Sequence, residues 1–346
     1  HKVRRTNLEK LKKILPVSNP LINYIPPVDM IFSLISTDPS RLSNNWLENY
    51  IKIEVREPFL KTDNPTMEFD GFKDWRSFDK GFSIGITPKE YIQENLIEWI
   101  IHSIDIENYC FYDHNTYYVS EYSNYHQYKD RHEIFIYGYD KNKNLFKCLD
   151  YFDFRHYTSK WIPFNEIFDA YYRYNELEVE DYIGGILTIK LKKYPDTKVN
   201  FNKIKYDLIT LIENDFIAPK FKRVLYGFCY FDELETLITQ TEKPDGLIDV
   251  KFSTFIYSHI YLMQMRCRIC FSAEINEKFE KAFQNLLVRS KNLEMMFLKT
   301  SLKFRSLNEG LTLKARKTFS ENIKYIKKEY RSLIYEIIEY FDCLCN

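Results

Sequence analysis

The sequence predicts an α+β protein in which an antiparallel sheet is followed by a mainly helical part. Between residues 109 and 191, short runs rich in apolar and aromatic residues alternate with polar turns, a pattern typical of strands. From residue 201 onward, apolar residues recur three and four positions apart, as they do along the buried face of a helix. The change near 195–200 predicts a first domain of residues 15–195 and a second of residues 196–346.

Composition and charge limit the classes of partner. Apolar residues make up 45% of the 346 residues, which is enough to bury a core. Lysine plus arginine and aspartate plus glutamate each number 49, so the net charge is zero and no general attraction to nucleic acid is expected. No stretch approaches 18 consecutive apolar residues, so no membrane span is expected. Seven cysteines without a secretory signal predict reduced thiols and a cytoplasmic protein.

The first elements are a lead-in, a buried helix and a long loop. Residues 1–15 are charged, and Pro27 suits the first turn of a short buried helix that ends near Asp38. The stretch 46–55 fits a helix or a strand, and 61–85 is rich in loop residues.

An amphipathic helix is predicted over 88–104, with Thr87 as its N-cap. Predicted strands follow at 109–112, 117–120, 132–139, 145–151 and 186–194, with a strand end and a helix over 161–172. Helices are predicted over 200–214, 232–240, 251–271, 274–307 and 313–344.

A histidine and an aspartate at the ends of two predicted strands form the candidate site. His132 opens one strand and Asp150 closes the next, with the polar turn 140–144 between them. Such a hairpin pairs residues whose numbers sum to roughly 282–284, so these two side chains are expected near each other. A carboxylate there would fix the imidazole tautomer and stabilise its cation. The alternative is a surface histidine beside a strand-end aspartate, with no chemical role.

The residues around this pair resemble a known family. Residues 132–140 (HEIFIYGYD), Leu149-Asp150, 161–164 (WIPF) and Ala170-Tyr171 look like the butirosin biosynthesis protein H family. Further on, 248–250 (IDV), His259 and 263–266 (MQMR) resemble the helical half of its clostridial and bacillar members. The resemblance covers roughly residues 15–290, and its more specific motif lies within 117–172.

This resemblance implies a papain-like domain over 15–195, related to bacteriocin-processing cysteine peptidases. It also implies a Cys–His–Asp site for acyl or aminoacyl transfer or amide formation in specialised-metabolite, nonribosomal-peptide-like biosynthesis. Substrates would be carried on the phosphopantetheine arm of an acyl- or peptidyl-carrier protein. By this resemblance His132 would be the general base and Asp150 the residue that orients it.

The nucleophile that the family pattern requires is missing. In papain-like proteins a cysteine begins the first buried helix, but the matching stretch 23–29 (NYIPPVD) has none, and the first cysteine in the chain is Cys110. Ser33 and Ser36 lie inside the predicted helix and are expected to be packing or helix-exit residues rather than nucleophiles. Asp29 suits the first turn of this helix electrostatically.

Three interpretations stay open. The chain can be a pseudoenzyme, a binding or scaffold protein of the same pathway without covalent catalysis. Cys110 can be recruited as the nucleophile from a neighbouring strand. Alternatively, His132 acts as a base without a protein nucleophile and helps an amine attack a thioester directly.

Other motifs give no cofactor or metal site. Cys267 and Cys270 have the CxxC spacing but no second pair completes four zinc ligands, so they are expected to pack in a helix. His114, His126 and His156 match no metal-ligand spacing, and no glycine-rich phosphate loop occurs. The basic runs 314–317 and 324–331 on the last helix are typical of a solvated face. They could also dock an acidic carrier protein, which charge reversal at Lys327 and Lys328 would test.

Overall fold

The computed structural model describes residues 11–23, 26–37, 46–56, 66–69, 82–92, 95–153, 156–177, 183–192, 199–213, 224–240, 250–307 and 312–345. The chain divides into two compact units. The sheet unit comprises residues 1–41 and 78–195, and the helical unit comprises residues 42–77 and 196–346.

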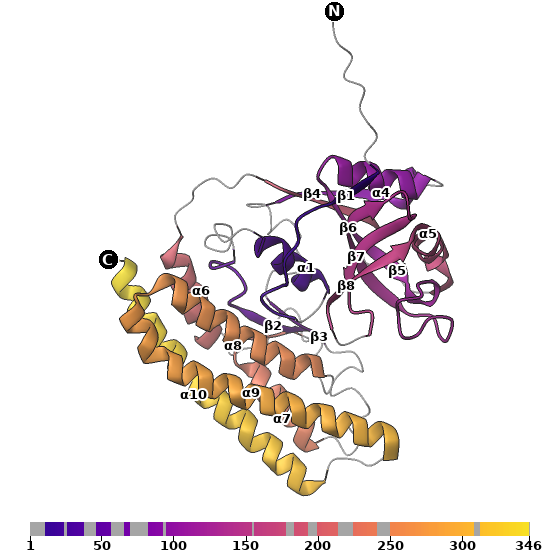
Figure 1. Ribbon diagram of the computed structural model, residues 1–346. Coiled ribbons are helices and arrows are strands. Elements are labelled where there is room, and N and C mark those ends of the chain that lie inside the picture. Colours follow the sequence, from indigo (N-terminus) through magenta and orange to yellow (C-terminus); the bar gives the residue numbers. More distant parts are fainter. Residues whose placement is uncertain are drawn as a thin grey trace, which may run out of the picture. The chain divides into compact units, whose positions relative to one another are not determined.

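The sheet unit is built on a seven-stranded antiparallel sheet (Figure 1). Its strands are β1 (Lys12–Ile14), β4 (Phe82–Pro88), β5 (Tyr109–Asn115), β6 (Arg131–Asp140), β7 (Leu145–Asp150), β8 (Thr158–Pro163) and β9 (Gly185–Leu191). They run in the order β4-β9-β5-β6-β7-β8, and β1 also pairs with β6. The antiparallel sheet that the alternating pattern predicted is therefore confirmed.

Strand β6 is the longest and pairs with three others. Its residues 131–136 pair with β5 and its residues 138–140 pair with β1, while β7 runs along its other edge. The register with β7 shifts between Ile136 and Gly138, which marks a bulge. A side chain at Gly138 would bring its Cβ within 2.9 Å of the Lys13 carbonyl oxygen, so glycine permits the close approach of β1.

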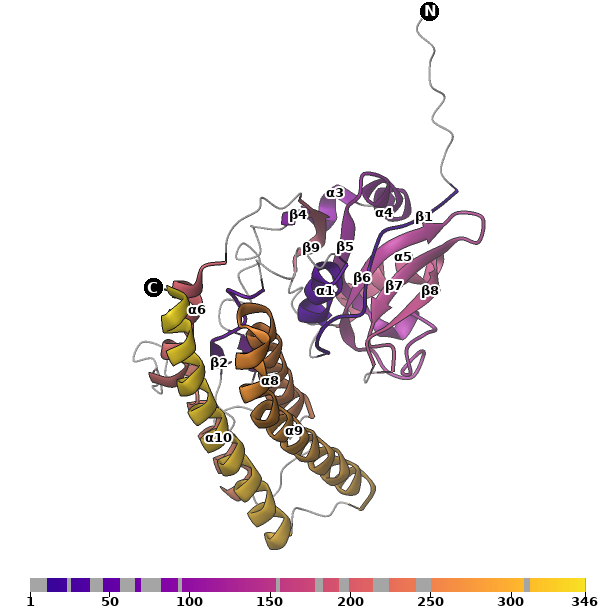
Figure 2. The ribbon, with the colours of Figure 1, turned by 60° about the vertical axis from the view of Figure 1, so that its left-hand side comes forward.

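Helices cover this sheet. They are α1 (Pro26–Ile35), α3 (Lys89–Ile92), α4 (Leu96–Asp105) and α5 (Phe164–Tyr172), with short 3-10 turns η3 (Thr116–Tyr118) and η4 (Arg173–Leu177). Helix α1 lies on one side of the sheet and α5 on the other (Figures 1 and 2). All ten residues of α1 are buried, as its apolar sequence predicts.

Two local predictions differ from the structure. The helix expected over 88–104 appears as α3 and α4, and Pro88 belongs to β4 because it pairs opposite Gly185. The strand expected over 117–120 is wrong: η3 forms there, and the Asn115 side chain accepts a hydrogen bond from the Tyr117 backbone N–H. This local side-chain bond competes with a strand ladder.

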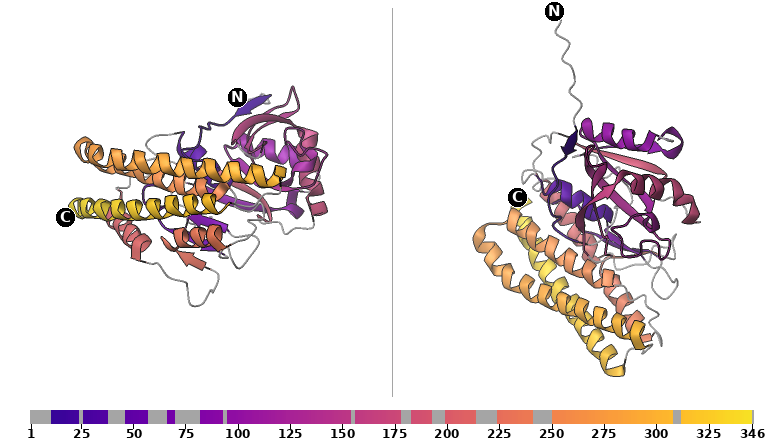
Figure 3. Two further views of the ribbon diagram at one scale, coloured as in Figure 1. Left: turned by 90° about the horizontal axis from the view of Figure 1, so that it is seen from below. Right: turned by 45° about the vertical axis from the view of Figure 1, so that its right-hand side comes forward.

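The helical unit contains α6 (Phe201–Glu213), α7 (Cys229–Gln240), α8 (Val250–Cys270), α9 (Ala273–Leu307) and α10 (Leu313–Cys345). Figure 3 shows the two longest helices, α9 and α10, running side by side. The helical carboxy-terminal half is thus confirmed. A small antiparallel sheet of β10 (Val224–Tyr226), β2 (Ile53–Arg56) and β3 (Thr66–Phe69), in that order, completes the unit.

The predicted continuous domain 15–195 needs one correction, because residues 42–77 belong to the helical unit. Strand β2 pairs with β10, and the buried Arg266 of α8 donates to the carbonyls of Trp46, Leu47 and Asn49. These long-range bonds leave little trace in the local pattern. The other predicted boundary, near 195–200, coincides with the division at residue 195.

Candidate active site

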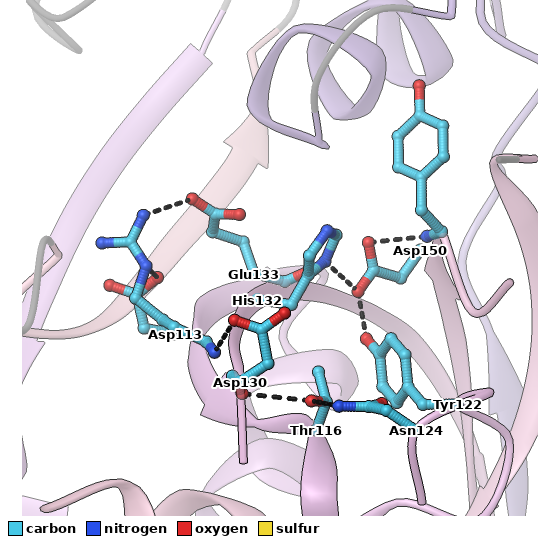
Figure 4. A network of polar contacts seen from close by, with 10 residues as sticks. Asp113, Thr116, Tyr122, Asn124, Asp130, His132, Glu133 and Asp150 are labelled. Carbon is cyan, nitrogen blue, oxygen red and sulfur yellow. Dashed lines mark hydrogen bonds and ion pairs between the residues drawn. The ribbon is translucent and has the colours of Figure 1, made fainter. Parts of the chain in front are cut away.

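His132 and Asp150 form a hydrogen-bonded ion pair at the end of the sheet. His132 is the second residue of β6 and Asp150 is the last residue of β7. The two side chains point toward each other, and Nδ1 of His132 lies 2.7 Å from Oδ2 of Asp150 (Figure 4). The Asp150 side chain is fully buried, whereas that of His132 is 18% exposed. The imidazole therefore has a fixed orientation and retains some access to solvent.

The strand register explains this meeting. Phe135 pairs with Leu149, which places Asp150 opposite Ile134 rather than opposite His132. Residues two apart on a strand share a face, so His132 and Asp150 are diagonal neighbours. The hairpin prediction thus brought the correct pair together, and the true register lies at the upper limit of the expected range.

Asp150 accepts two further hydrogen bonds. The Tyr122 hydroxyl donates to Oδ2, the oxygen that also contacts His132, and the Tyr151 backbone N–H donates to Oδ1 at 2.7 Å. Three hydrogen-bonding groups therefore converge on one buried carboxylate. Tyr122 was not singled out from the sequence, because it lies in an irregular segment whose position depends on long-range contacts.

The ring of His132 is charged at neutral pH. Burial alone lowers its pKa, but the charge and hydrogen bond of Asp150, together with Glu133, outweigh burial and raise the pKa to about 9. Burial and the neighbouring Asp150 raise the pKa of Tyr122 well above its usual value, so its hydroxyl keeps its proton. At neutral pH the His132 ring is therefore an imidazolium, and the Tyr122 hydroxyl is protonated.

Asp29 lies in the first turn of α1, as expected, and it also reaches the surroundings of the pair. Its side chain is fully buried and accepts a hydrogen bond from the Tyr151 hydroxyl. The Tyr151 ring packs edge-on against His132, with 6.4 Å between ring centroids. Tyr151 therefore links α1 to the pair. Residues 24–25 of the stretch that should hold a cysteine lie outside the described residues.

Cys110 lies far from the His132–Asp150 pair. It lies opposite Ile136 on β5, whereas His114 lies opposite His132, four residues or about 13 Å further along the strand. Burial raises the pKa of the Cys110 thiol to about 12, against a smaller opposing effect of the Ser103 hydroxyl. A thiol that stays protonated and distant from the base is a poor nucleophile.

Ser33 of α1 and Ser36, which follows the helix, give no nucleophile either. Ser33 is fully buried, and the hydroxyls of Ser33 and Ser36 find no hydrogen-bond partner among the described residues. No base contacts them within that part of the chain. Ser33 is thus packed inside α1 as expected, whereas Ser36 lies just beyond the helix, which ends at Ile35.

The remaining sequence motifs are placed as follows. Cys267 and Cys270 lie in α8, and burial raises the pKa of both thiols. Across the described ranges, no group of three or more His, Cys, Asp or Glu residues is arranged to hold a metal ion. The exposed His156 instead pairs with Asp153, with 2.6 Å between Nδ1 and Oδ2.

No protein-family model matches the sequence, and no curated protein is similar enough to count as a relative. The family resemblance around His132 therefore stays a prediction. Of the helices that the structure describes, none has both the length and the apolar content needed to cross a membrane.

Proposed function

We propose that this chain promotes acyl or aminoacyl transfer in the assembly of a specialised metabolite. Its substrate would be an acyl group held as a thioester on the phosphopantetheine arm of an acyl- or peptidyl-carrier protein. The sheet unit would be a papain-like domain of the butirosin biosynthesis protein H type that works without a cysteine nucleophile. In this proposal His132 is the acid–base residue and Asp150 orients it.

The observation that carries the proposal is the geometry of the His132–Asp150 pair. In an exposed histidine–aspartate pair, solvent would screen the interaction and the imidazole pKa would stay near its ordinary value. Three hydrogen-bonding groups on the carboxylate would also not be expected in such a pair. Here the carboxylate is fully buried and the imidazole pKa is raised to about 9. Strongly perturbed groups of this kind cluster at functional sites.

The charge of the pair defines what His132 can do. At neutral pH its ring is a proton donor, and Nε2 is the nitrogen that Asp150 does not hold. In the proposed reaction an amine nitrogen bonds to the thioester carbonyl carbon and the carbon–sulfur bond breaks. The electron pair leaves on sulfur, which takes the proton from Nε2. The proton that the amine nitrogen loses then returns to His132.

A non-catalytic binding or scaffold protein of the same pathway is the second candidate. The placement of Cys110, remote from His132 and with a pKa of about 12, favours it over covalent catalysis. An imidazolium held by a carboxylate can also bind an anionic or carbonyl ligand without turning it over. Catalysis and binding differ in whether product depends on His132.

The test combines an acyl-loaded carrier protein with an amine acceptor and follows amide formation by mass spectrometry. We expect product with the unaltered chain and its loss with His132→Ala. His156→Ala, which removes an exposed histidine that also pairs with an aspartate, should retain activity. Carrier binding without product would support the scaffold role, and the absence of both would reject both proposals.

The intact mass of the protein after the same incubation tests the covalent alternative. The proposal predicts no acyl adduct. An adduct that disappears in Cys110→Ser would restore Cys110 as the nucleophile and contradict the direct reaction.

A further inference from the structure

Tyr122 is a buried tyrosine that lies in no regular element and reaches the centre of the candidate site. Its side chain is 2% exposed, and it follows η3 in a segment of turns. Its hydroxyl donates to Oδ2 of Asp150, the same oxygen that lies 2.7 Å from Nδ1 of His132. Tyr122 and His132 therefore share one acceptor atom, as Figure 4 shows.

The segment around Tyr122 is held in place by hydrogen bonds to three nearby segments of the sheet unit. The Ser123 backbone N–H donates to the Phe152 carbonyl at 3.0 Å, just beyond Asp150. The buried Asn124 side chain donates to the Thr116 hydroxyl at 2.8 Å and to the Tyr128 carbonyl at 3.0 Å. These bonds hold the chain directly after Tyr122, and the Tyr122 backbone N–H donates to the Val119 carbonyl at 3.1 Å. The hydroxyl of Tyr122 therefore has a defined position.

The Tyr122 ring packs against three other aromatic rings. Its centroid lies 5.0 Å from that of Phe152, 5.2 Å from that of His114 and 6.1 Å from that of His132. A tyrosine that served packing alone could leave its hydroxyl unpaired, as Tyr112 does: the Tyr112 hydroxyl is buried and finds no hydrogen-bond partner among the described residues. The hydrogen bond from the Tyr122 hydroxyl to Asp150 is therefore not a consequence of ring packing alone.

We propose that Tyr122 is a positioning residue of the site: by sharing Oδ2 of Asp150 with His132, it limits how strongly the carboxylate holds the imidazole proton. The importance of this for catalysis rests on the function proposed above, whereas the effect on His132 does not. Each donor to a carboxylate oxygen withdraws part of its negative charge. Without the Tyr122 hydroxyl, more of that charge faces Nδ1.

The other ionisable groups around His132 act in known directions. Glu133 adds to the effect of Asp150 in raising the pKa of His132. His114, its cross-strand neighbour, stays neutral at neutral pH because burial lowers its pKa to about 4. Tyr151 packs against the ring and is joined to Asp29. Within the described part of the chain, Glu133, His114 and Tyr151 make no hydrogen bond to Oδ2 of Asp150, whereas Tyr122 does. Tyr122 therefore has a distinct influence on His132.

The experiment is a pH titration of the His132 ring by NMR in the full chain, with Tyr122→Phe compared with Tyr112→Phe. We expect Tyr122→Phe to raise the pKa of His132 by about half a pH unit, roughly a threefold gain in proton affinity. Tyr112→Phe removes a buried hydroxyl that makes no hydrogen bond with the described residues, so it should leave the titration unchanged. An unchanged or lowered pKa in Tyr122→Phe would overturn the proposal.

A second variant keeps the shape of the site if Tyr122→Phe fails to fold. Fluorotyrosine placed at position 122 retains the hydroxyl and makes it a stronger donor, so the pKa of His132 should fall. A rise or no change would also reject the role of Tyr122. Because neither titration requires a carrier or an acyl group, their outcome is independent of whether acyl transfer occurs.

Discussion

At the scale of single residues, the charge on His132 reflects two opposing effects. Burial disfavours the imidazolium, whereas the ionised Asp150 beside it favours the cation. The second effect dominates because Asp150 is fully buried and its charge is poorly screened. For His114, one cross-strand step away, burial outweighs the opposing charge of Asp150, and the pKa falls to about 4. The two histidines therefore differ in pKa because only His132 contacts the Asp150 carboxylate.

The raised pKa of His132 predicts a pH-dependent stability. Its folded pKa of about 9 exceeds the usual 6.5, so the contribution is fully present below pH 6.5 and is lost as pH rises through about 9. The contribution is on the order of 3 kcal/mol at most. Urea unfolding of the unaltered chain and His132→Gln at pH 6 and pH 10 measures it. The difference between the two proteins should shrink at pH 10; a constant difference would contradict the raised pKa.

Asp150→Asn should reverse the ionisation of His132. With the carboxylate charge gone, burial dominates and the pKa of His132 should fall below 6.5, which NMR titration measures directly. Stability near neutral pH should fall by about 3 kcal/mol, since a buried pair loses one partner. Asp153→Asn, which removes the exposed partner of His156, is the matched control and should change stability by less than about 1 kcal/mol. A pKa of His132 that stays near 9 in Asp150→Asn would exclude Asp150 as the cause.

The sequence predicted part of this site and missed the rest for a physical reason. His132 and Asp150 lie on one hairpin, so strand alternation and turn length were enough to bring them together. Tyr122 reaches Asp150 from an irregular segment, and Asp29 reaches Tyr151 across 122 residues. Neither contact has a local period, and only the folded chain shows them.

At the scale of elements, Arg266 organises the start of the helical unit. This arginine of α8 is fully buried, and its guanidinium donates to the carbonyls of Trp46, Leu47 and Asn49. On the same helix, Nε2 of His259 lies 2.7 Å from the Ile51 carbonyl oxygen. These bonds attach an irregular segment to a helix more than 200 positions later in the chain. Arg266, the last residue of the 263–266 (MQMR) stretch, thus has a structural role.

Arg266→Met should therefore destabilise the helical unit strongly. Three carbonyls would lose charged donors, and a loss of 3 kcal/mol or more, on the order seen when buried polar networks are broken, is expected in chemical unfolding. Arg268→Met, two positions away, removes a more exposed arginine that pairs with Glu280. That control should change stability by less than about 1 kcal/mol. Equal effects of the two substitutions would contradict the role given to Arg266.

At the scale of the whole molecule, the order of elements followed the sequence closely, but the membership of residues 42–77 did not. The periods of strands and long helices are local, so most elements from residue 109 onward were predicted with the correct type. The pairing of β2 with β10 joins segments about 170 residues apart, and their short strands carry no periodic signal. The small sheet of the helical unit could only come from the structure.

The proposed carrier-protein partner can be tested on α10, with one change to the sequence-based design. Lys327 already pairs with Asp232 and Lys324 with Glu235, so much of the basic run stabilises the contact with α7. Lys328 is exposed and is the cleaner probe. We expect Lys328→Glu to weaken binding of an acidic carrier severalfold in titration calorimetry, with a greater effect at low salt. Unchanged binding would exclude this face as the docking site.

The most direct test of His132 as a proton donor is the pH dependence of amide formation. The acceptor should be an amine that is unprotonated at neutral pH, such as hydroxylamine, and the measured quantity is the ratio of rates with the unaltered chain and with His132→Gln. We predict a ratio well above one at pH 7 that falls toward one as pH rises through about 9, where the imidazolium loses its proton. A ratio of one at every pH, or a ratio that rises through pH 9, would contradict the proposed role of the His132–Asp150 pair.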